Sequence, residues 1–504
     1  MKVTINRDSD APVYVQIIEQ VRRQILSGEL LPGFRLPAER KLAENLGVNR
    51  TTVLNAYSEL KAEGLIGSRV GAGTIVLSYL DEELSGCGSS REPQWNQIFS
   101  QYSNRFDSCL VQDLLMLASR NDVISFATGI ASPESGPIEA LEGIENEVVN
   151  NRNFRSLLHT PTEGFISLRK VVCGLMQKRG LYCRPDEIMI LSGSQQGIDL
   201  AARILIDPGD IVVVEEPTYF PAIQVFRTAG ARVIGVPIDD KGMNVDVLEQ
   251  LLHRYRPKLI YTIPTFQNPS GAEMELERRK RLVRLASKHN VMILEDDAYG
   301  DLCYEGNLLP MLKSLDNEGY VIYLSTFSKN IYSGLRLGWM VAHKKIIREF
   351  ASAKQLIDLH SSSLSQYIVE RFIENGSLEA HLNKVCSEYR TRRDIMYKAL
   401  AKYAPKDLIW NRPKGGYYFW CRLPDGISSL KLLAKAADYK VSFVPGSPFF
   451  SSGQGDNFIR LNFTYAPLKD IEEGIKRLCA AMKELEAEKG NDDLYSILEI
   501  NPIV

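Results

Sequence analysis

Most of the chain alternates short apolar runs with longer stretches of helical periodicity, and this alternation constrains its fold more than any other feature. The apolar runs are rich in Val, Ile and Leu and cover residues 188–191, 211–214, 232–236, 259–263, 291–294 and 321–324. Strands that alternate with helices are typical of α/β folds with a mostly parallel sheet. We therefore expect such a domain over residues 113–485, with a second, small α/β part toward its end.

The first 78 residues predict a separate small unit. Helical periodicity and capping residues predict helices over residues 13–26, 37–46 and 50–63, and Asn49 is placed to cap the third helix. Short strand-like segments follow at residues 65–66 and 74–77, with glycines between them. This order predicts a helix-turn-helix followed by a β-hairpin wing.

The remaining segments and the composition add few constraints. Residues 79–112 contain few packing residues and are interpreted as a linker, and residues 486–504 as a C-terminal tail. The net charge of −2 over 504 residues indicates no general affinity for nucleic acid or membranes. No apolar run approaches the roughly 20 residues of a membrane span, no signal peptide is evident, and the eight cysteines form no Cys-x-x-Cys pair. We expect a cytoplasmic protein without a metal site.

The position of one lysine suits a residue that bonds covalently to a carbonyl compound. Lys329 follows the apolar run at 321–324, with Thr326 and Ser328 close before it and Arg336 seven residues after it. A lysine amine becomes a good nucleophile when it is desolvated against a carbonyl group. The hydroxyls and the arginine could hold a phosphate on the same carbonyl compound.

Other polar residues follow the other apolar runs. They are Gly193, Ser194 and Gln195, before a helix expected to begin near Ile198, then Tyr219, Asn268, Asp296 and Tyr299, with Arg460 inside a later apolar strand. Taken singly, each of these residues also has a purely structural interpretation. Residues 193–195 fit a capped turn, Tyr219 a loop anchor and Asn268 an ordinary turn. Asp296 fits an acid at a strand end, and Arg460 a structural salt bridge. Ligands of parallel sheets bind at the carboxyl ends of the strands, so the joint order favours one site.

This set resembles the pyridoxal phosphate (PLP) site of fold-type I, class I/II aminotransferases. The resemblance implies that Lys329 carries PLP, that Asp296 rather than Asp297 meets the ring nitrogen, and that Tyr219 stacks on the ring. It assigns the 3′-oxygen to Asn268 and Tyr299, and the carboxylate of an amino acid to Arg460. The phosphate would be held by Gly193, Ser194, Gln195, Thr326, Ser328 and Arg336. His159 stands where these enzymes often have a Tyr that reaches the partner subunit's phosphate, which puts that contact in doubt.

The N-terminal unit resembles the winged helix of GntR-family regulators over about residues 10–78. The resemblance places a set of residues on DNA: Arg35, Arg40, Asn49, Arg50, Thr51, Thr52 and Gly71. A recognition helix enters the major groove N-terminal end first, and arginine can fork onto guanine there. The unit has ten Lys and Arg against eight Asp and Glu, so its charge leaves a protein-binding winged helix open.

A winged helix, a linker and an aminotransferase-like body together resemble the MocR (GabR-like) subfamily of bacterial transcription regulators. The resemblance implies a homodimer that binds operator DNA and senses an amino acid or amine through an external aldimine. Two alternatives stay open. The chain could be a working aminotransferase that carries a DNA-binding domain, or it could sense PLP itself and control vitamin B6 supply.

Overall fold

The computed structural model describes residues 3–6, 12–26, 29–30, 34–63, 65–69, 73–76, 98, 100, 122–150 and 160–498. The chain divides into two units, residues 1–105 and 106–504, and each is described by itself. Of the expected linker at 79–112, only Ile98 and Ser100 lie within the described residues, and Gly71 and His159 lie outside them. No helix of the described part is both long and apolar enough to cross a membrane.

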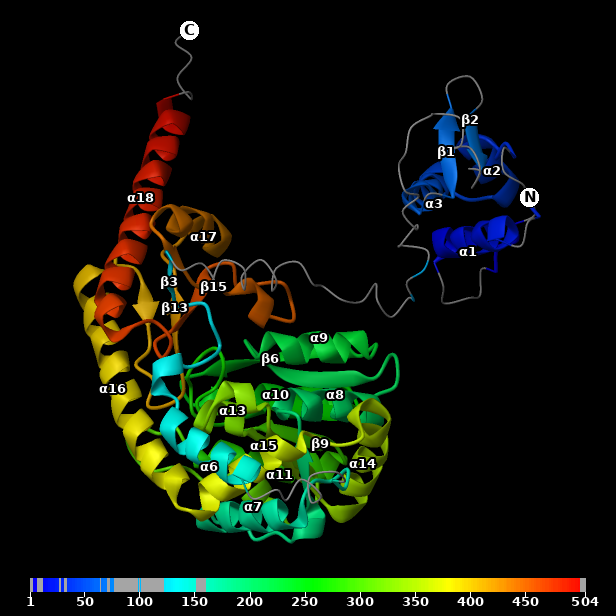
Figure 1. Cartoon of the computed structure of the whole chain (residues 1–504). Coiled ribbons are helices and arrows are strands. Elements are labelled where there is room, and N and C mark those ends of the chain that lie inside the picture. The colour runs from blue at the N-terminus through cyan, green and yellow to red at the C-terminus, as the bar shows by residue number, and fades with distance from the viewer. Residues whose placement is uncertain are drawn as a thin grey trace. The chain divides into compact units, whose positions relative to one another are not determined.

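The N-terminal unit is a winged helix (Figure 1, blue). Its elements are α1 (Val13–Leu26), α2 (Glu39–Leu46), α3 (Arg50–Ala62), β1 (Ile66–Arg69) and β2 (Gly73–Val76). The core is formed by residues at helical spacing, including Ile17, Val21, Val53 and Leu60, all fully buried. As predicted, Asn49 caps α3, because its side chain accepts a hydrogen bond from the Thr51 amide. The second helix begins at Glu39 rather than Pro37.

The second unit is built on an eight-stranded sheet, which confirms the predicted mostly parallel α/β domain. The strand order is β4-β11-β10-β9-β8-β5-β6-β7, and the five strands from β10 to β6 run parallel. Their bounds are β4 (Ile188–Leu191), β5 (Ile211–Glu216), β6 (Arg232–Asp239), β7 (Gly242–Met243), β8 (Leu259–Thr262), β9 (Met292–Asp296), β10 (Val321–Thr326) and β11 (Gly338–Val341). Each of the six apolar runs therefore corresponds to a strand of this sheet.

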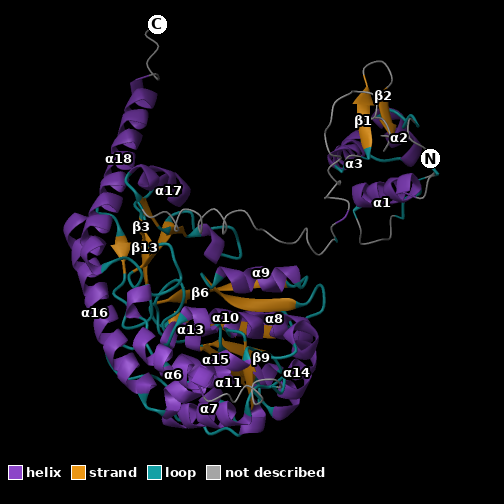
Figure 2. Ribbon diagram, viewed as in Figure 1, coloured by secondary structure: helices purple, strands orange, loops and turns teal. Residues whose placement is uncertain are grey.

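Helices cover both faces of this sheet (Figure 2). One face packs against α8 (Ser194–Leu205), α9 (Phe220–Thr228) and α14 (Lys344–Asp358). The helices packed on the other face are α6 (Ile138–Asn150), α7 (Ile166–Lys178), α10 (Val245–Arg254), α11 (Leu276–His289) and α15 (Ser363–Glu374). Along β4, Met189 and Leu191 belong to the first core, whereas Ile188 and Ile190 belong to the second. Successive side chains alternate across the sheet, so a strand such as β4 contributes to the cores on both faces.

A smaller α/β part follows. Its four-stranded sheet has the order β12-β13-β16-β15, formed by β12 (Ile409–Trp410), β13 (Tyr418–Arg422), β15 (Val444–Pro445) and β16 (Phe458–Asn462). The helices α16 (Ser377–Tyr403), α17 (Ser429–Asp438) and α18 (Ile471–Leu498) accompany it, and β3 (Ile124–Ser125) pairs with β14 (Val441–Ser442). Residues 486–498, expected to be part of a tail, continue helix α18. The second unit also contains the short helices α12 (Leu312–Leu315) and α13 (Phe327–Asn330).

Candidate functional site: a lysine cavity and a winged helix

A cavity of about 210 Å³ brings together residues from strand ends that are far apart in the sequence. Seven residues of the predicted site line it: Ser194, Tyr219, Asn268, Asp296, Tyr299, Lys329 and Arg460. The backbone of residues 127–129, just after β3, forms another wall. The cavity therefore draws on the large sheet, the small sheet and the first described segment of the second unit.

Lys329 extends into this cavity from α13, the short helix that follows β10. Its ammonium donates a hydrogen bond to the Gly129 carbonyl oxygen. Burial and the positive charges of Arg460 and Arg336 together lower the pKa of Lys329 to about 8, while Asp296 opposes them. About a tenth of a lysine with such a pKa is the neutral, nucleophilic amine at neutral pH, far more than for an ordinary lysine.

Asp296 and Asp297 lie at the end of β9, and of these two residues only Asp296 lines the cavity. Asp296 is buried and lines the cavity, with Oδ2 accepting a hydrogen bond from the Tyr261 hydroxyl at 2.8 Å. Asp297 instead accepts hydrogen bonds from Arg179 and Tyr323. Burial raises the pKa of Asp296 to about 6, with Asp297 adding to the rise and Tyr261 opposing it. The other oxygen of Asp296, Oδ1, is buried without a partner.

A polar cluster forms the opposite wall. The Arg460 guanidinium donates from Nη1 to Asn268 Oδ1 at 3.0 Å and from Nη2 to the Ala127 carbonyl at 3.1 Å. It also lies over the Tyr418 ring, 4.2 Å from the ring centre, and its Nε is buried without a partner. The hydroxyls of Tyr299 and Tyr418 are 3.1 Å apart. This arginine is buried but keeps one N–H available for an acceptor.

A second group of predicted residues meets beside the first turn of α8. This helix begins at Ser194, four residues earlier than expected, so the amides at 194 and 195 belong to its N-terminal turn. Gly193 has φ of +95°, and a Cβ there would lie 3.1 Å from Arg336 Nη2. Arg336 Nη1 in turn donates to Ser328 Oγ at 3.3 Å. Open amides, an arginine and a serine at a helix N-terminus suit a phosphate.

Two further residues that were predicted to contact the phosphate, Thr326 and Gln195, have side chains that are less available for that contact. The Thr326 hydroxyl donates to the Leu337 carbonyl at 3.1 Å and accepts a hydrogen bond from the Ser328 amide. Because it caps α13, its first role in this structure is to position the segment that carries Lys329. Gln195 follows Ser194 in α8, and its Oε1 is buried without a partner.

These features fit PLP. The buried Asp296 Oδ1 lacks a partner, as expected of a carboxylate that meets a protonated ring nitrogen. The glycine at 193 leaves Arg336 open at a helix N-terminus, where a phosphate would lie. Lys329 and Asp296 line the same cavity, with Tyr219 on its wall as well. Within the described residues, no cluster of three or more His, Cys, Asp or Glu offers a metal site.

Several residues in or beside the cavity lining were not predicted from the sequence. Tyr418, Tyr261 and the backbone around Gly129 contact predicted site residues directly. Tyr261 is one more apolar-looking residue in a buried strand, and Tyr418 lies in the small sheet, more than a hundred residues away from Tyr299. No local motif marks either residue, because only the packing of two distant segments brings them to the cavity.

Most of the predicted DNA contacts that the structure describes lie at exposed positions of the N-terminal unit. Arg35, Arg40 and Arg50 are exposed, and Arg50 forms an ion pair with Glu39 at 3.5 Å. Arg35 lies against the start of the wing, where a Cβ on Gly73 would be 3.3 Å from its Nε. Thr51 follows Asn49 at the N-terminus of α3 and donates to its side chain, and Thr52 is half-buried in the same turn. The arginines, α3 and the wing therefore share one small unit.

Family models match both units. Residues 121–478 match the model of aminotransferase class I and II, and residues 13–76 match that of the bacterial regulatory proteins of the gntR family. The aromatic-amino-acid aminotransferase 1 of Thermococcus litoralis is 42% identical over 396 residues, which is 77% of this chain and 95% of the relative. The kynurenine aminotransferase of Pyrococcus horikoshii, solved in complex with PMP, superimposes with a TM-score of 0.75 at 41% identity, covering 77% of this chain and 98% of that one.

Relatives that span both units also match. The HTH-type transcriptional regulator YisV of Bacillus subtilis is 33% identical over 482 residues, which cover 95% of this chain and 98% of the relative. The aminotransferase class and the solved neighbour establish PLP as the cofactor of the second unit. The gntR model establishes the first unit as a DNA-binding domain of a transcription regulator. The chain thus belongs to the GntR-type regulators that carry a class I/II aminotransferase domain, the MocR subfamily.

Proposed function

We propose that this protein regulates transcription in response to an amino acid or amine that its PLP domain binds. The observation that carries the proposal is the half-buried Lys329, whose pKa is about 8, in one cavity with Asp296 and Arg460. Bound PLP supplies a carbonyl carbon that amines can attack and a ring that can accept electrons. The two units together supply a sensor and a DNA reader in one chain.

Each cavity residue has a proposed part in recognition. Lys329 holds the cofactor covalently, and Asp296 keeps the proton on its ring nitrogen. Gly193, Ser194, Gln195, Thr326, Ser328 and Arg336 hold its phosphate, and Tyr219, Asn268 and Tyr299 orient its ring. Arg460 takes the carboxylate of the effector, since its Nε is buried without a partner. A buried arginine that meets an anion regains the interactions lost with water.

The wall beyond Arg460 indicates the effector's side chain. Phe220, Pro221 and Val444 line the cavity there, and the described lining includes no cation besides Lys329 and Arg460. A second carboxylate would therefore find no positive partner among these residues. We expect amino acids with apolar or small side chains to bind better than dicarboxylic ones.

Two features support a homodimer. Leu356 and Leu359, at the end of α14, are 90% and 65% exposed. Between them lies Asp358, which accepts hydrogen bonds from Ser192 and Gln196 beside the proposed phosphate site. Exposed leucines on either side of a hydrogen-bonded aspartate favour burial against a second copy of this chain. A dimer would present two winged helices to a repeated operator, in the cytoplasm where the chromosome lies.

Turnover as an aminotransferase is a second candidate function. Lys329, with its lowered pKa, and Tyr299 line the cavity beside Asp296, so every group that moves a proton in such a reaction is present. A third candidate, a sensor of PLP itself, would use the same site without an amine effector.

Absorbance titration separates these candidates. The purified protein is loaded with PLP and then mixed with single amino acids and ω-amino acids, while the visible band and operator binding are followed together. A sensor gives a band that shifts and holds, together with changed DNA affinity. Release of a keto acid with formation of pyridoxamine phosphate would make turnover the main activity. DNA affinity that depends on PLP alone would favour the PLP sensor, and no PLP band at all would overturn the proposal.

A further inference from the structure

A second cavity, of about 420 Å³, lies beside the same strand end as the PLP site but on the side of Asp297. Its walls come from the end of α7, the loop after β9, strand β11 and the first turns of α16. Six of its fifteen lining residues are aliphatic or Met: Leu175, Met176, Leu308, Ile373, Leu378 and Leu382. A mostly apolar cavity of this size with a few polar groups is typical of small-molecule sites.

Two hydrogen-bond donors in this wall have no acceptor. Arg179 Nη2 and Trp339 Nε1 are both buried without a partner, and Trp339 is only 1% exposed. Buried polar groups are usually hydrogen-bonded, so two unpartnered donors in the lining of one cavity require an explanation. A ligand with an accepting oxygen would satisfy them.

The charges nearby decide which kind of oxygen fits. Arg179 already forms ion pairs with Asp297 at 2.7 Å and with Asp301 at 3.7 Å. The other cation of the lining, Lys178, pairs with Glu379 at 3.5 Å. The two cations therefore face three carboxylates, which leaves no net positive charge for an anion. We propose that this cavity binds a small, neutral and largely apolar molecule whose carbonyl or similar oxygen accepts from Arg179 and Trp339.

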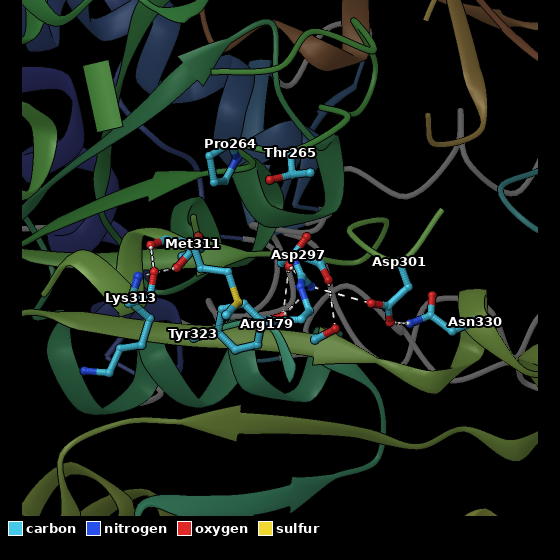
Figure 3. A network of polar contacts seen from close by, with 12 residues as sticks. Arg179, Pro264, Thr265, Asp297, Asp301, Met311, Lys313, Tyr323 and Asn330 are labelled. Carbon is cyan, nitrogen blue, oxygen red and sulfur yellow. Dashed lines mark hydrogen bonds and ion pairs between the residues drawn. The ribbon is translucent and has the colours of Figure 1, made fainter. Parts of the chain in front are cut away.

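The same arginine connects the cavity to the residues of the PLP site. Figure 3 shows Arg179 between Asp297 and Asp301, with Asp301 also bonded to Asn330. Asn330 Nδ2 donates to Asp301 Oδ2 at 2.6 Å, and Asn330 directly follows Lys329. Asp297 directly follows Asp296. A ligand that attracts Arg179 therefore acts on both strand ends that carry the cofactor residues, and this coupling rests on the proposed function.

Binding itself can be measured without the cofactor. The full-length protein is titrated with 4-fluoroacetophenone, a neutral aromatic ketone, by fluorine NMR. We expect saturable binding in about the millimolar range, as for other ligands of this size. Asn383→Trp places a large side chain on the cavity wall and should weaken binding at least about tenfold. Lys384→Trp, at the next exposed position of α16, is the matched control and should bind as the parent does.

Further arms test the chemistry of the ligand. Trp339→Phe removes one donor and should weaken ketone binding about fivefold. The anion 4-fluorobenzoate should bind more weakly than the ketone. The absence of saturable ketone binding, or equal binding to the parent and Asn383→Trp, overturns the site. Stronger binding of the benzoate than of the ketone would overturn the proposal that the ligand is neutral.

The coupling has its own readout. With PLP bound, the ketone should shift the pH midpoint of the visible band in the parent protein but not in Asn383→Trp. Ketone binding without such a shift would overturn the proposed coupling between this cavity and the PLP site, but would still support the binding site itself. Ketone binding by a protein that shows no PLP band, or by Lys329→Ala, supports the site even where the proposed function fails.

Discussion

The two units hold their functional residues in opposite ways. In the winged helix, Arg35, Arg40 and Arg50 are exposed, and the ion pairs of Arg40 with Glu44 and of Arg50 with Glu39 lie at the surface. In the aminotransferase domain, Asp296 and Arg460 are 4% exposed, and Lys329 has a strongly lowered pKa. Exposed charges keep ordinary chemistry and act by their number and placement, whereas buried ones acquire new chemistry.

This contrast predicts the sizes of mutational effects. Removing an exposed arginine should alter one contact with DNA and leave the fold intact. Removing a buried charge leaves its partner desolvated, so that both chemistry and stability change. Substitutions in the two units, taken in order of decreasing expected effect, test whether the contrast holds.

The largest effect is expected for Lys329→Ala. Without the amine no covalent link to PLP forms, so the visible band of the lysine-bound cofactor should be lost completely. Lys354→Gln is the matched control, because Lys354 likewise has a lowered pKa but pairs with Asp358 outside the cavity. A band that survives Lys329→Ala, or disappears only in the control, would refute the assignment of Lys329.

Arg179→Met should destabilise the second unit by about 3 kcal/mol, since breaking a buried pair leaves the other charge uncompensated. Asp297 is only 1% exposed, and Arg179 is its cationic partner. Denaturant midpoints measured by circular dichroism give the change. The control is Arg184→Met, whose pairs with Asp186 and Glu187 are exposed, and which should cost under about 1 kcal/mol. Equal losses would erase the contrast between buried and exposed charges.

Arg50→Ala should weaken operator binding by about 2 kcal/mol, roughly thirtyfold, and reduce the salt slope by about one. The residue begins the proposed recognition helix and is 65% exposed at its side chain. Fluorescence anisotropy at several salt concentrations measures both quantities. Lys61→Ala removes a positive charge from the last turn of the same helix and should have little effect. If both substitutions act alike, the helix contributes general charge and no base recognition.

The smallest effect concerns pH. Burial, with help from Arg460, places the pKa of Lys329 near 8 and so favours the neutral amine above that pH. The rate at which PLP attaches should rise with pH up to about 8 and then level off. Arg460→Gln removes a neighbouring positive charge and should move this midpoint upward, by less than about one pH unit.

The matched control for this shift is Arg422→Gln. Arg422 lies in the same small sheet, half-exposed near Asp425, and its substitution should leave the midpoint unchanged. Stopped-flow absorbance at a series of pH values measures the attachment rate. A midpoint that moves downward in Arg460→Gln, or equally in both variants, would contradict the proposed influence of buried charges on Lys329.

Local sequence patterns were sufficient for much of the architecture. The apolar runs determined the strands, because a buried parallel strand needs continuous Val, Ile and Leu whatever its neighbours are. Asn49 determined the start of α3, since a cap acts within one turn. The boundaries were less certain. Helix α8 begins at Ser194 instead of near Ile198, and α18 continues to Leu498 through the expected tail.

Part of the site could also be predicted from the sequence. Lys329 and Asp296 follow strands in an order that a parallel sheet brings to one edge, and the resemblance to the aminotransferase pattern favoured Asp296 over Asp297. The contact between Tyr299 and Tyr418 could not be inferred in this way, because it joins two distant segments through their packing.

By itself, the sequence determined the two units, their order and the strand ends at which polar residues gather, since these depend on local periodicity and short motifs. Only the tertiary structure decided which groups are buried together. It placed Arg460 beside Lys329, left Asp296 Oδ1 without a partner and set Asp297 against Arg179. Desolvation and charge act between residues that are close in space, and in this chain those residues are distant in sequence.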